Sequence, residues 1–158
     1  MMVDPSEIEQ VLELLEATPH HLASLSRDVD SSRLHFKPDE DTWSANEILA
    51  HLRACADTWG KSILKMIAQD HPTIRYVSPR TWIRKTDYPQ QEFHSSLEAY
   101  THQRNELLKA LRTLKIEDWS RGATFTGTTR GRENTVLSYA QRIVNHEGEH
   151  CAQMEGLL

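Results

Sequence analysis

Two histidines stand four residues apart in the string His146-Glu147-Gly148-Glu149-His150, within the last helical segment that the sequence predicts. Side chains with this spacing lie about 40° apart around a helix and one turn along it. Both imidazoles can therefore reach one ion, and imidazole is a good ligand for zinc and nickel. Such pairs also occur as surface decoration, so the meaning of this pair depends on a third ligand.

The same string fits the H-E-x-x-H pattern, in which the glutamate acts as the general base of a zinc protease. The extended form of that pattern requires a glycine and then a histidine further along the helix. This chain has Gln153 and Gly156 at those two positions. We therefore expect any third ligand to come from upstream.

The upstream candidates lie on the second predicted helix. His51 and Cys55 are one turn apart and lie at the edge of its apolar stripe, as His146 and His150 do on the last helix. Edge positions on two helices can converge at the mouth of a bundle, where ligands stay close to solvent. Three neutral imidazoles with an open coordination position would let a metal lower the pKa of a bound water or hold a substrate thiol as thiolate. Cys55 is equally well explained as a small buried apolar residue.

Several other titratable residues have competing explanations. Glu147 lies nearer the centre of the apolar stripe than either histidine, which is unusual for a carboxylate. It is a candidate for a partner of a metal ligand, for a general base, or for the edge of a wider polar cleft. Glu47 is expected to cap the second helix. His20 and His21 follow Pro19 and are expected in solvent.

Composition restricts the class of protein. The chain has 158 residues, of which 38% are hydrophobic and 26% charged, and this suits a single domain over residues 1–158. A net charge of −5 gives no electrostatic reason to bind nucleic acid. No apolar run approaches the roughly 20 residues that span a bilayer, so we expect no membrane segment and a cytoplasmic protein. Cys55 and Cys151 are expected to be thiols there.

Four helical segments can position these residues. Apolar spacing predicts helices over about Pro5–Asp28, Ser44–Gln69, Gln90–Leu114 and Glu133–Leu157. Pro19 should kink or interrupt the first, and Ser44 with Glu47 forms a capping box at the second. The connection over 70–89 is long and has room for a short helix near Trp82, and the Gly- and Thr-rich stretch over 120–132 predicts a loop or small hairpin. Long amphipathic helices must bury their stripes together, so the fold class is all-α, a four-helix bundle with long connections.

Two stretches resemble the DinB-like superfamily. The stretch over 41–52, DTWSANEILAHL, is similar to the W-S-x-x-E-I-L-x-H-L signature that opens the second helix in that family. The stretch over 146–154, HEGEHCAQM, is similar to the closing H-x-x-x-H-x-x-Q-I/M. The separation of about 95 residues also suits the family. The resemblance covers essentially the whole chain, although only the two motifs are specific.

The resemblance implies a four-helix bundle in which three histidines bind a divalent metal, commonly nickel or zinc. Residue by residue, it carries over to His51, His146 and His150, and it leaves Cys55 as an optional neighbour. It does not imply DNA binding. Family members with an assigned activity include transferases that use a low-molecular-weight thiol, bacillithiol or mycothiol, and related isomerases. Family habit also implies a homodimer, for which an apolar patch left in the connections would be a slight physical motive.

Three functions are consistent with these residues. The leading one is a thiol-dependent S-transferase acting on a small molecule, in which the metal lowers the pKa of a thiol so that thiolate attacks an electrophile. The second is a hydrolase that uses metal-bound water with Glu147 as base. The third is a non-enzymatic metal- or ligand-binding protein of a stress response. Four basic residues in the connections are candidates for the polar lining of a pocket: Arg84, Lys85, Arg130 and Arg132.

Overall fold

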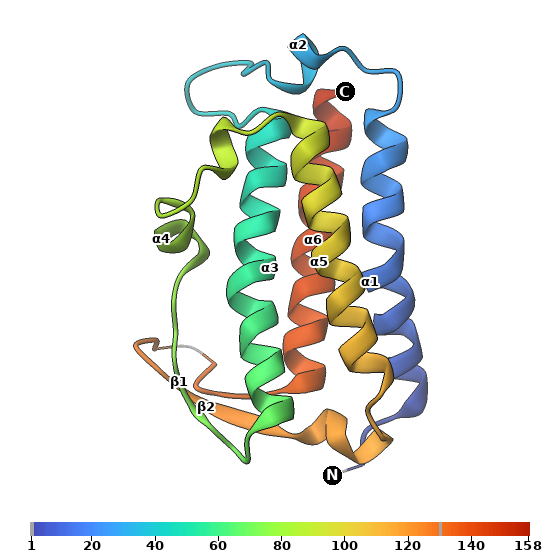
Figure 1. Ribbon diagram of the computed structural model, residues 1–158, viewed down its shortest axis with the longest axis vertical. Coiled ribbons are helices and arrows are strands. Elements are labelled where there is room, and N and C mark those ends of the chain that lie inside the picture. The colour runs from blue at the N-terminus through green and yellow to red at the C-terminus, as the bar shows by residue number, and fades with distance from the viewer. Residues whose placement is uncertain (1, 130) are drawn as a thin grey trace.

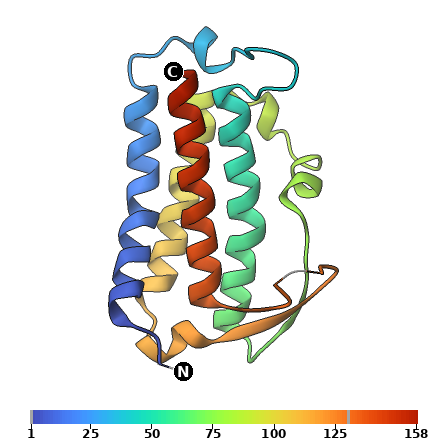
Figure 2. The same ribbon diagram turned by 180° about the vertical axis from the view of Figure 1, so that it is seen from behind.

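Four long helices form the body of the protein in a computed structural model that describes residues 2–129 and 131–158. They are α1 (Pro5–Ser26), α3 (Ala45–Ala68), α5 (Phe93–Arg112) and α6 (Val136–Leu157). α3 packs against both α5 and α6, and α1 packs against the same two helices from the other side (Figures 1 and 2). This arrangement confirms the predicted four-helix bundle.

The helices begin where the sequence predicts them. At the start of α3, Ser44 Oγ accepts a hydrogen bond from the Glu47 backbone N–H at 3.1 Å, and the Glu47 carboxylate accepts one from the Ser44 N–H at 3.1 Å. This capping box satisfies two backbone donors that the first turn of a helix leaves free. α6 begins with a similar exchange between Thr135 and Ser138, which is three residues later than the predicted start at Glu133.

Pro19 does not interrupt the first helix, and that part of the prediction was wrong. α1 continues through Pro19 to Ser26, and the proline ring is buried. A proline has no N–H, so the carbonyl four residues earlier, that of Leu15, loses its helical partner. Arg104 Nη1 from α5 donates to that carbonyl at 2.9 Å. A neighbouring helix thus replaces the hydrogen bond that the proline removes.

The connections contain more structure than the sequence predicts. They hold the short helices α2 (Ser31–Leu34) and α4 (Pro79–Ile83), two 3-10 helices (Tyr88–Gln90 and Ile116–Ser120), and the strands β1 (Thr73–Arg75), β2 (Gly122–Thr126) and β3 (Glu133–Thr135). β2 and β3 form the expected hairpin, and β1 pairs with β2 in parallel, which the sequence did not predict. A strand of three residues is too short to show a period of two. Within the described residues, no helix is both long enough and apolar enough to cross a membrane.

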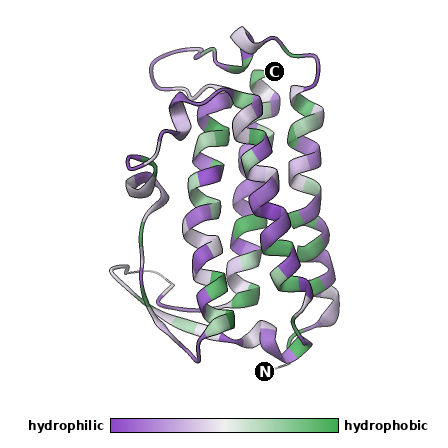
Figure 3. Cartoon of the chain, in the orientation of Figure 1, coloured by the Kyte–Doolittle hydropathy of each residue, from purple (hydrophilic) through white to green (hydrophobic). Residues whose placement is uncertain are grey.

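The apolar faces of the four helices meet inside the bundle, and the hydrophilic faces point outward (Figure 3). The largest side chains with almost no exposed surface are Trp119, Tyr100, Tyr139, Phe93 and Phe125. Phe125 from β2 stacks on Tyr139 of α6 with ring centroids 4.9 Å apart, so the small sheet covers one end of the bundle. Cys55 and Cys151 are both buried free thiols.

One ion pair is buried within this core. The guanidinium of Arg104 on α5 binds both carboxylate oxygens of Glu147 on α6, and the Tyr100 hydroxyl donates to the same carboxylate. Arg104 and Glu147 are 2% and 3% exposed. A buried charge is tolerated only when it is paired and hydrogen-bonded, as both charges are here. The cluster joins α5 and α6 directly and α1 through Leu15.

Removing one charge of this pair should be strongly destabilising. We expect Glu147→Gln to lower the free energy of unfolding by about 3–5 kcal/mol, because it leaves the Arg104 guanidinium buried without a counter-charge. The matched control is Arg112→Met, which breaks the pair between Arg112 and Glu16, both about half exposed. That change should cost no more than about 1 kcal/mol. Urea denaturation measures both, and equal small losses would contradict a structural role for the buried pair.

Candidate metal centre

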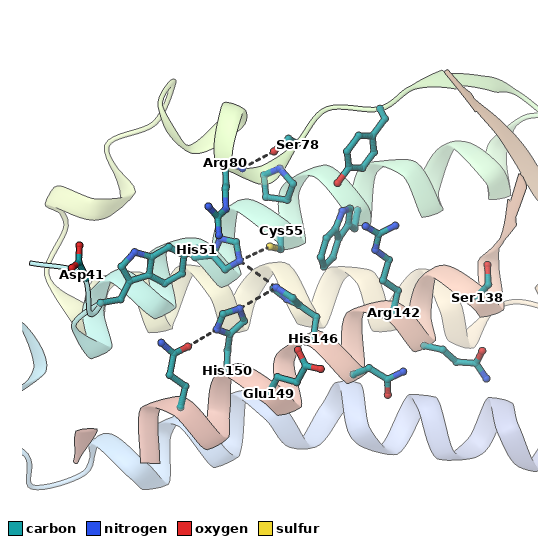
Figure 4. A pocket seen from close by; sticks show the side chains of 17 residues that line it. Asp41, His51, Cys55, Ser78, Arg80, Ser138, Arg142, His146, Glu149 and His150 are labelled. Atoms are coloured by element: carbon teal, nitrogen blue, oxygen red, sulfur yellow. Dashed lines mark hydrogen bonds between the residues drawn. The ribbon is translucent and has the colours of Figure 1, made fainter. Parts of the chain in front are cut away.

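Three imidazoles converge between α3 and α6. His51 comes from α3, and His146 and His150 come from successive turns of α6 (Figure 4). The Nε2 atoms of His51 and His146 are 3.2 Å apart, although the two residues are 95 positions apart in the chain. The Nε2 atoms of His146 and His150 are 3.0 Å apart. The structure thus brings together the three histidines that the sequence singled out.

Neighbouring side chains orient the rings. His150 Nδ1 lies 2.9 Å from Gln153 Oε1, an acceptor, so the proton of a neutral His150 lies on Nδ1 and the lone pair lies on Nε2. A hydrogen bond from the second ring nitrogen is the usual support of a histidine that binds metal. Trp59 lies edge-on to His146, and Trp43 is tilted over His51, each with centroids 5.0 Å apart. Aromatic contact limits the rotation of both imidazoles.

The spacing of the donor atoms fits a single small cation. Imidazole nitrogens bound tetrahedrally to zinc at its usual bond length lie about 3.3 Å from one another. The observed separations of 3.2 and 3.0 Å are close to that value. Lone pairs brought this close repel one another unless a proton or a cation lies between them. The donor set, three nitrogens of borderline softness, suits zinc and nickel.

Cys55 lies beside this trio. Its Sγ atom is 3.5 Å from His51 Nε2, and ligand atoms of His51, Cys55 and His146 all lie within 4.8 Å of one another. Burial raises the pKa of the Cys55 thiol well above its usual value, and the nearby Glu147 carboxylate raises it further. Without a metal, Cys55 is therefore a neutral thiol. The alternatives given by the sequence, a buried apolar residue and a neighbour of the site, are both compatible with this position.

The imidazoles are held in the neutral state that coordination requires. Burial, with repulsion from His150 and from Arg80, lowers the pKa of His51 to about 4. Burial, with repulsion from His150, His51 and Arg142, lowers the pKa of His146 to about 3. Both groups are thus neutral throughout the range in which an ordinary histidine, with a pKa near 6.5, takes up a proton.

The trio lies in the wall of a large open pocket. The pocket has a volume of about 1150 Å³ and lies between α3, α6 and the segment that includes α4. Its charged lining residues, besides the histidines, are Asp41, Arg80, Arg142 and Glu149. The arrangement can hold a metal with one face open to a ligand of considerable size.

Two of these lining residues were missed by the sequence analysis. Arg142 stands one helical turn before His146 and on the same face of α6, so the spacing of four that linked the histidines would have found it. Arg80 is brought in by the fold of the long connection, and no local pattern indicated it. Of the four basic residues predicted to line a pocket, Arg84, Lys85 and Arg132 do not line this one, and Arg130 lies outside the described residues.

Glu147 does not face the pocket. Its carboxylate points into the core and is held by Tyr100 and Arg104, so the geometry gives it no route to a proton in the pocket. A base at this position, one of the roles considered for Glu147, finds no support in the structure. The unusual placement of a carboxylate near the apolar stripe is explained by the buried ion pair. His20 and His21 are exposed, as expected, and His21 contacts Glu155 at 2.7 Å.

Comparison with known proteins agrees with this architecture. The family model of the DinB superfamily matches residues 14–154. A solved structure described as "YfiT from Bacillus subtilis is a probable metal-dependent hydrolase with an unusual four-helix bundle topology" is similar, with a TM-score of 0.85 over 98% of this chain and 87% of that one. The sequence identity is 19%, so this likeness shows a shared fold. No curated protein matches the chain.

The lowered histidine pKa values predict how the stability of the metal-free protein depends on pH. Below a pH of about 6.5 the unfolded chain binds protons at residues 51 and 146, whereas the folded chain does not until pH about 4 and 3. The free energy of unfolding should therefore fall as pH decreases from 6.5 to 5, a range in which few carboxylates titrate. His146→Gln should flatten this slope, and His20→Gln, at an exposed position, should not. Urea denaturation at several pH values measures the slope, and identical slopes in all three proteins would refute the prediction.

Proposed function

Since the chain belongs to the DinB superfamily, we propose that it is a metal-dependent enzyme in which His51, His146 and His150 hold one divalent cation, nickel or zinc. The observation that carries this proposal is the convergence of three Nε2 atoms from two helices, 3.0 and 3.2 Å apart, in the wall of an open pocket. Three protein ligands leave a coordination position free, as in catalytic sites and unlike closed structural ones. A divalent cation held there would lower the pKa of a thiol or a water that binds at the free position.

The chain itself offers no obvious nucleophile. Cys55, the thiol nearest the imidazoles, is 3% exposed and its pKa is raised, so it is poorly suited to attack a substrate. The nucleophile should then be brought in by a small molecule. We favour a thiol for a specific reason: a thiol that binds a metal loses its proton outright, whereas a water still needs a base. Glu147, the carboxylate considered for that task, is bound to Arg104 in the core.

The proposed reaction is therefore an S-transfer. A low-molecular-weight thiol binds at the free position, and its thiolate attacks an electrophilic carbon, so that a C–S bond forms as the bond to the leaving group breaks. The pocket, with about 1150 Å³, has room for both molecules. The histidines orient the thiol, and Trp43 and Trp59 restrict the movement of the imidazoles.

One observation favours hydrolysis as a second candidate. Glu149 lines the pocket beside His146 and His150 and could accept a proton from a water. The similar structure from Bacillus subtilis is described as a probable metal-dependent hydrolase. Binding of a metal or a ligand without turnover, as in a stress-response protein, is the third alternative. We further propose a single domain that acts as a cytoplasmic homodimer, which a mass measurement by light scattering at micromolar concentration would test.

Metal binding should depend on each of the three histidines. His51→Ala, His146→Ala and His150→Ala should each weaken the binding of Zn²⁺ and Ni²⁺ by at least about tenfold, the lower end of the loss seen on removing much weaker supporting contacts. Mass spectrometry of the metal content of the purified proteins measures this loss. His20→Ala and His21→Ala, at exposed positions of α1, are the matched controls and should retain the metal of the unmodified protein. Stoichiometric metal at unchanged affinity in the His51 variant would exclude the proposed site.

Consumption of an electrophile distinguishes the candidate reactions. With 1-chloro-2,4-dinitrobenzene as electrophile, product should form only when both a low-molecular-weight thiol and the metal are present, with release of chloride. His51→Ala should reduce the rate to that of the uncatalysed reaction. Turnover of an ester panel without any thiol would support hydrolysis instead. Metal binding with no turnover of either substrate would support the non-enzymatic alternative.

A further inference from the structure

Two guanidinium groups in the pocket have no counter-charge. Arg80 is on α4 and Arg142 is on α6, and both line the pocket that contains the histidines (Figure 4). In the part of the chain that the structure describes, neither one forms a salt bridge with a carboxylate. Other arginines of this protein are paired or hydrogen-bonded, among them Arg104, Arg112, Arg53, Arg33 and Arg121. The two arginines of the pocket are therefore free to bind an anion.

The surroundings hold the Arg142 guanidinium in position. It lies over the ring of Trp59 with 4.9 Å between its central carbon and the ring centroid, and near Tyr139 and Tyr76 at 5.7 and 5.9 Å. Arginine stacks on aromatic faces while its five donors remain available at the edge of the guanidinium plane. An arginine supported in this way loses little side-chain freedom when a ligand binds. Arg142 is thus arranged as a binding group, although it has no ligand within the protein.

The segment that contains Arg80 is attached to α3 by a single carboxylate. Asp57 on α3 accepts hydrogen bonds from Trp82 Nε1 at 2.8 Å and from the Tyr88 hydroxyl at 2.6 Å, and these two residues follow Arg80 closely in the chain. Arg53 lies over the Tyr88 ring at 3.7 Å and strengthens the same attachment. Ser78 caps the start of α4 by accepting from the Arg80 backbone N–H at 3.2 Å. These contacts fix the backbone from which the Arg80 side chain extends towards His51 (Figure 4).

The two positive charges act on the imidazoles from different elements. Arg80 lowers the pKa of His51, and Arg142 lowers that of His146. The carboxylates of the lining, Asp41 and Glu149, have no comparable effect on either imidazole. The electrostatic potential beside the three histidines is therefore positive, which attracts negatively charged ligands.

We propose that the pocket binds a dicarboxylate-bearing small molecule, one carboxylate at Arg80 and the other at Arg142, with the rest of the molecule lying beside the three imidazoles. The proposal rests on the proposed function in one respect, because it makes this molecule the substrate or the thiol that reacts there. Two separate guanidinium groups on different elements suit two spaced carboxylates better than one compact anion. Arginine and carboxylate pair through two parallel hydrogen bonds, which gives each subsite its preference for a planar anion.

Binding of α,ω-dicarboxylates tests the proposal without any turnover. The probes are malonate, succinate, glutarate and adipate, titrated into metal-stripped and metal-loaded protein and followed by the fluorescence of the pocket residues Trp43 and Trp59. One member of the series should bind best in both forms, because the spacing of the arginines selects a length. Its monomethyl ester and inorganic phosphate should bind about tenfold more weakly. Equal binding of the diacid, the ester and phosphate would overturn the proposal.

Variants assign the binding to the two arginines. Arg80→Gln and Arg142→Gln should each weaken binding of the best dicarboxylate about tenfold and remove the preference over the monomethyl ester. The matched control is Arg84→Gln, which removes the same charge from the end of α4 but does not line the pocket, and it should change affinity less than twofold. If all three variants lose affinity equally, general attraction by positive charge is the cause and the proposal fails.

The metal-stripped protein separates this proposal from the proposed function. Dicarboxylate binding that depends on both arginines but occurs in a protein with no affinity for metal would leave the proposal standing and refute the metal-dependent enzyme. Metal binding at the histidines, with dicarboxylate binding that does not depend on either arginine, would do the reverse. Circular dichroism of each variant shows whether the helices are retained, so a loss of binding through unfolding is recognised directly.

Discussion

The buried guanidinium of Arg104 is the group on which the arrangement of the helices depends. It neutralises Glu147 on α6, contacts Tyr100 on its own helix and supplies the carbonyl of Leu15 with a hydrogen bond that Pro19 cannot make. One side chain thereby fixes α1, α5 and α6 relative to one another. Because a buried charge is costly unless all its partners are in place, a shift of α6 by one turn would break several hydrogen bonds together. The position of His146, next to Glu147 in the chain, follows from this constraint.

The site itself combines two opposing demands. Ligand atoms must be dry enough to remain neutral, and burial lowers the pKa values of His51 and His146 accordingly. They must also be reachable by a substrate, which the open pocket provides. The two arginines serve both demands, because their positive charge disfavours protonation of the imidazoles and favours approach of an anion. A metal would add positive charge to the same region, so the surrounding charge favours neutral imidazoles and an anionic ligand at once.

Much of this architecture was predictable from local patterns. The spacing of four between His146 and His150 places two imidazoles on one helical face in any context, and the Ser44–Glu47 capping box determines where α3 starts. The meeting of His51 with this pair was inferred from edge positions and family motifs, and it depends on packing between α3 and α6 that no local pattern encodes. The role of Glu147 was not predictable because it depends on Arg104, 43 residues earlier on another helix. Arg80 was missed for the same reason, since a nonlocal contact through Asp57 positions its segment.

The distance of α6 from α3 along the chain has a consequence for the synthesis of this protein. At a translation rate of roughly 5–20 residues per second, the 95 residues between His51 and His146 take about 5–20 s to make. During that interval α1, α3 and α5 can pack, but the face of α3 that receives α6 has no partner and remains in water. The apolar groups of that face, Cys55 and Trp59 among them, are exposed to other nascent chains and to oxidants until the last helix emerges. The order of synthesis thus makes the final helix the one that protects the chain from aggregation as well as the one that completes the histidine trio.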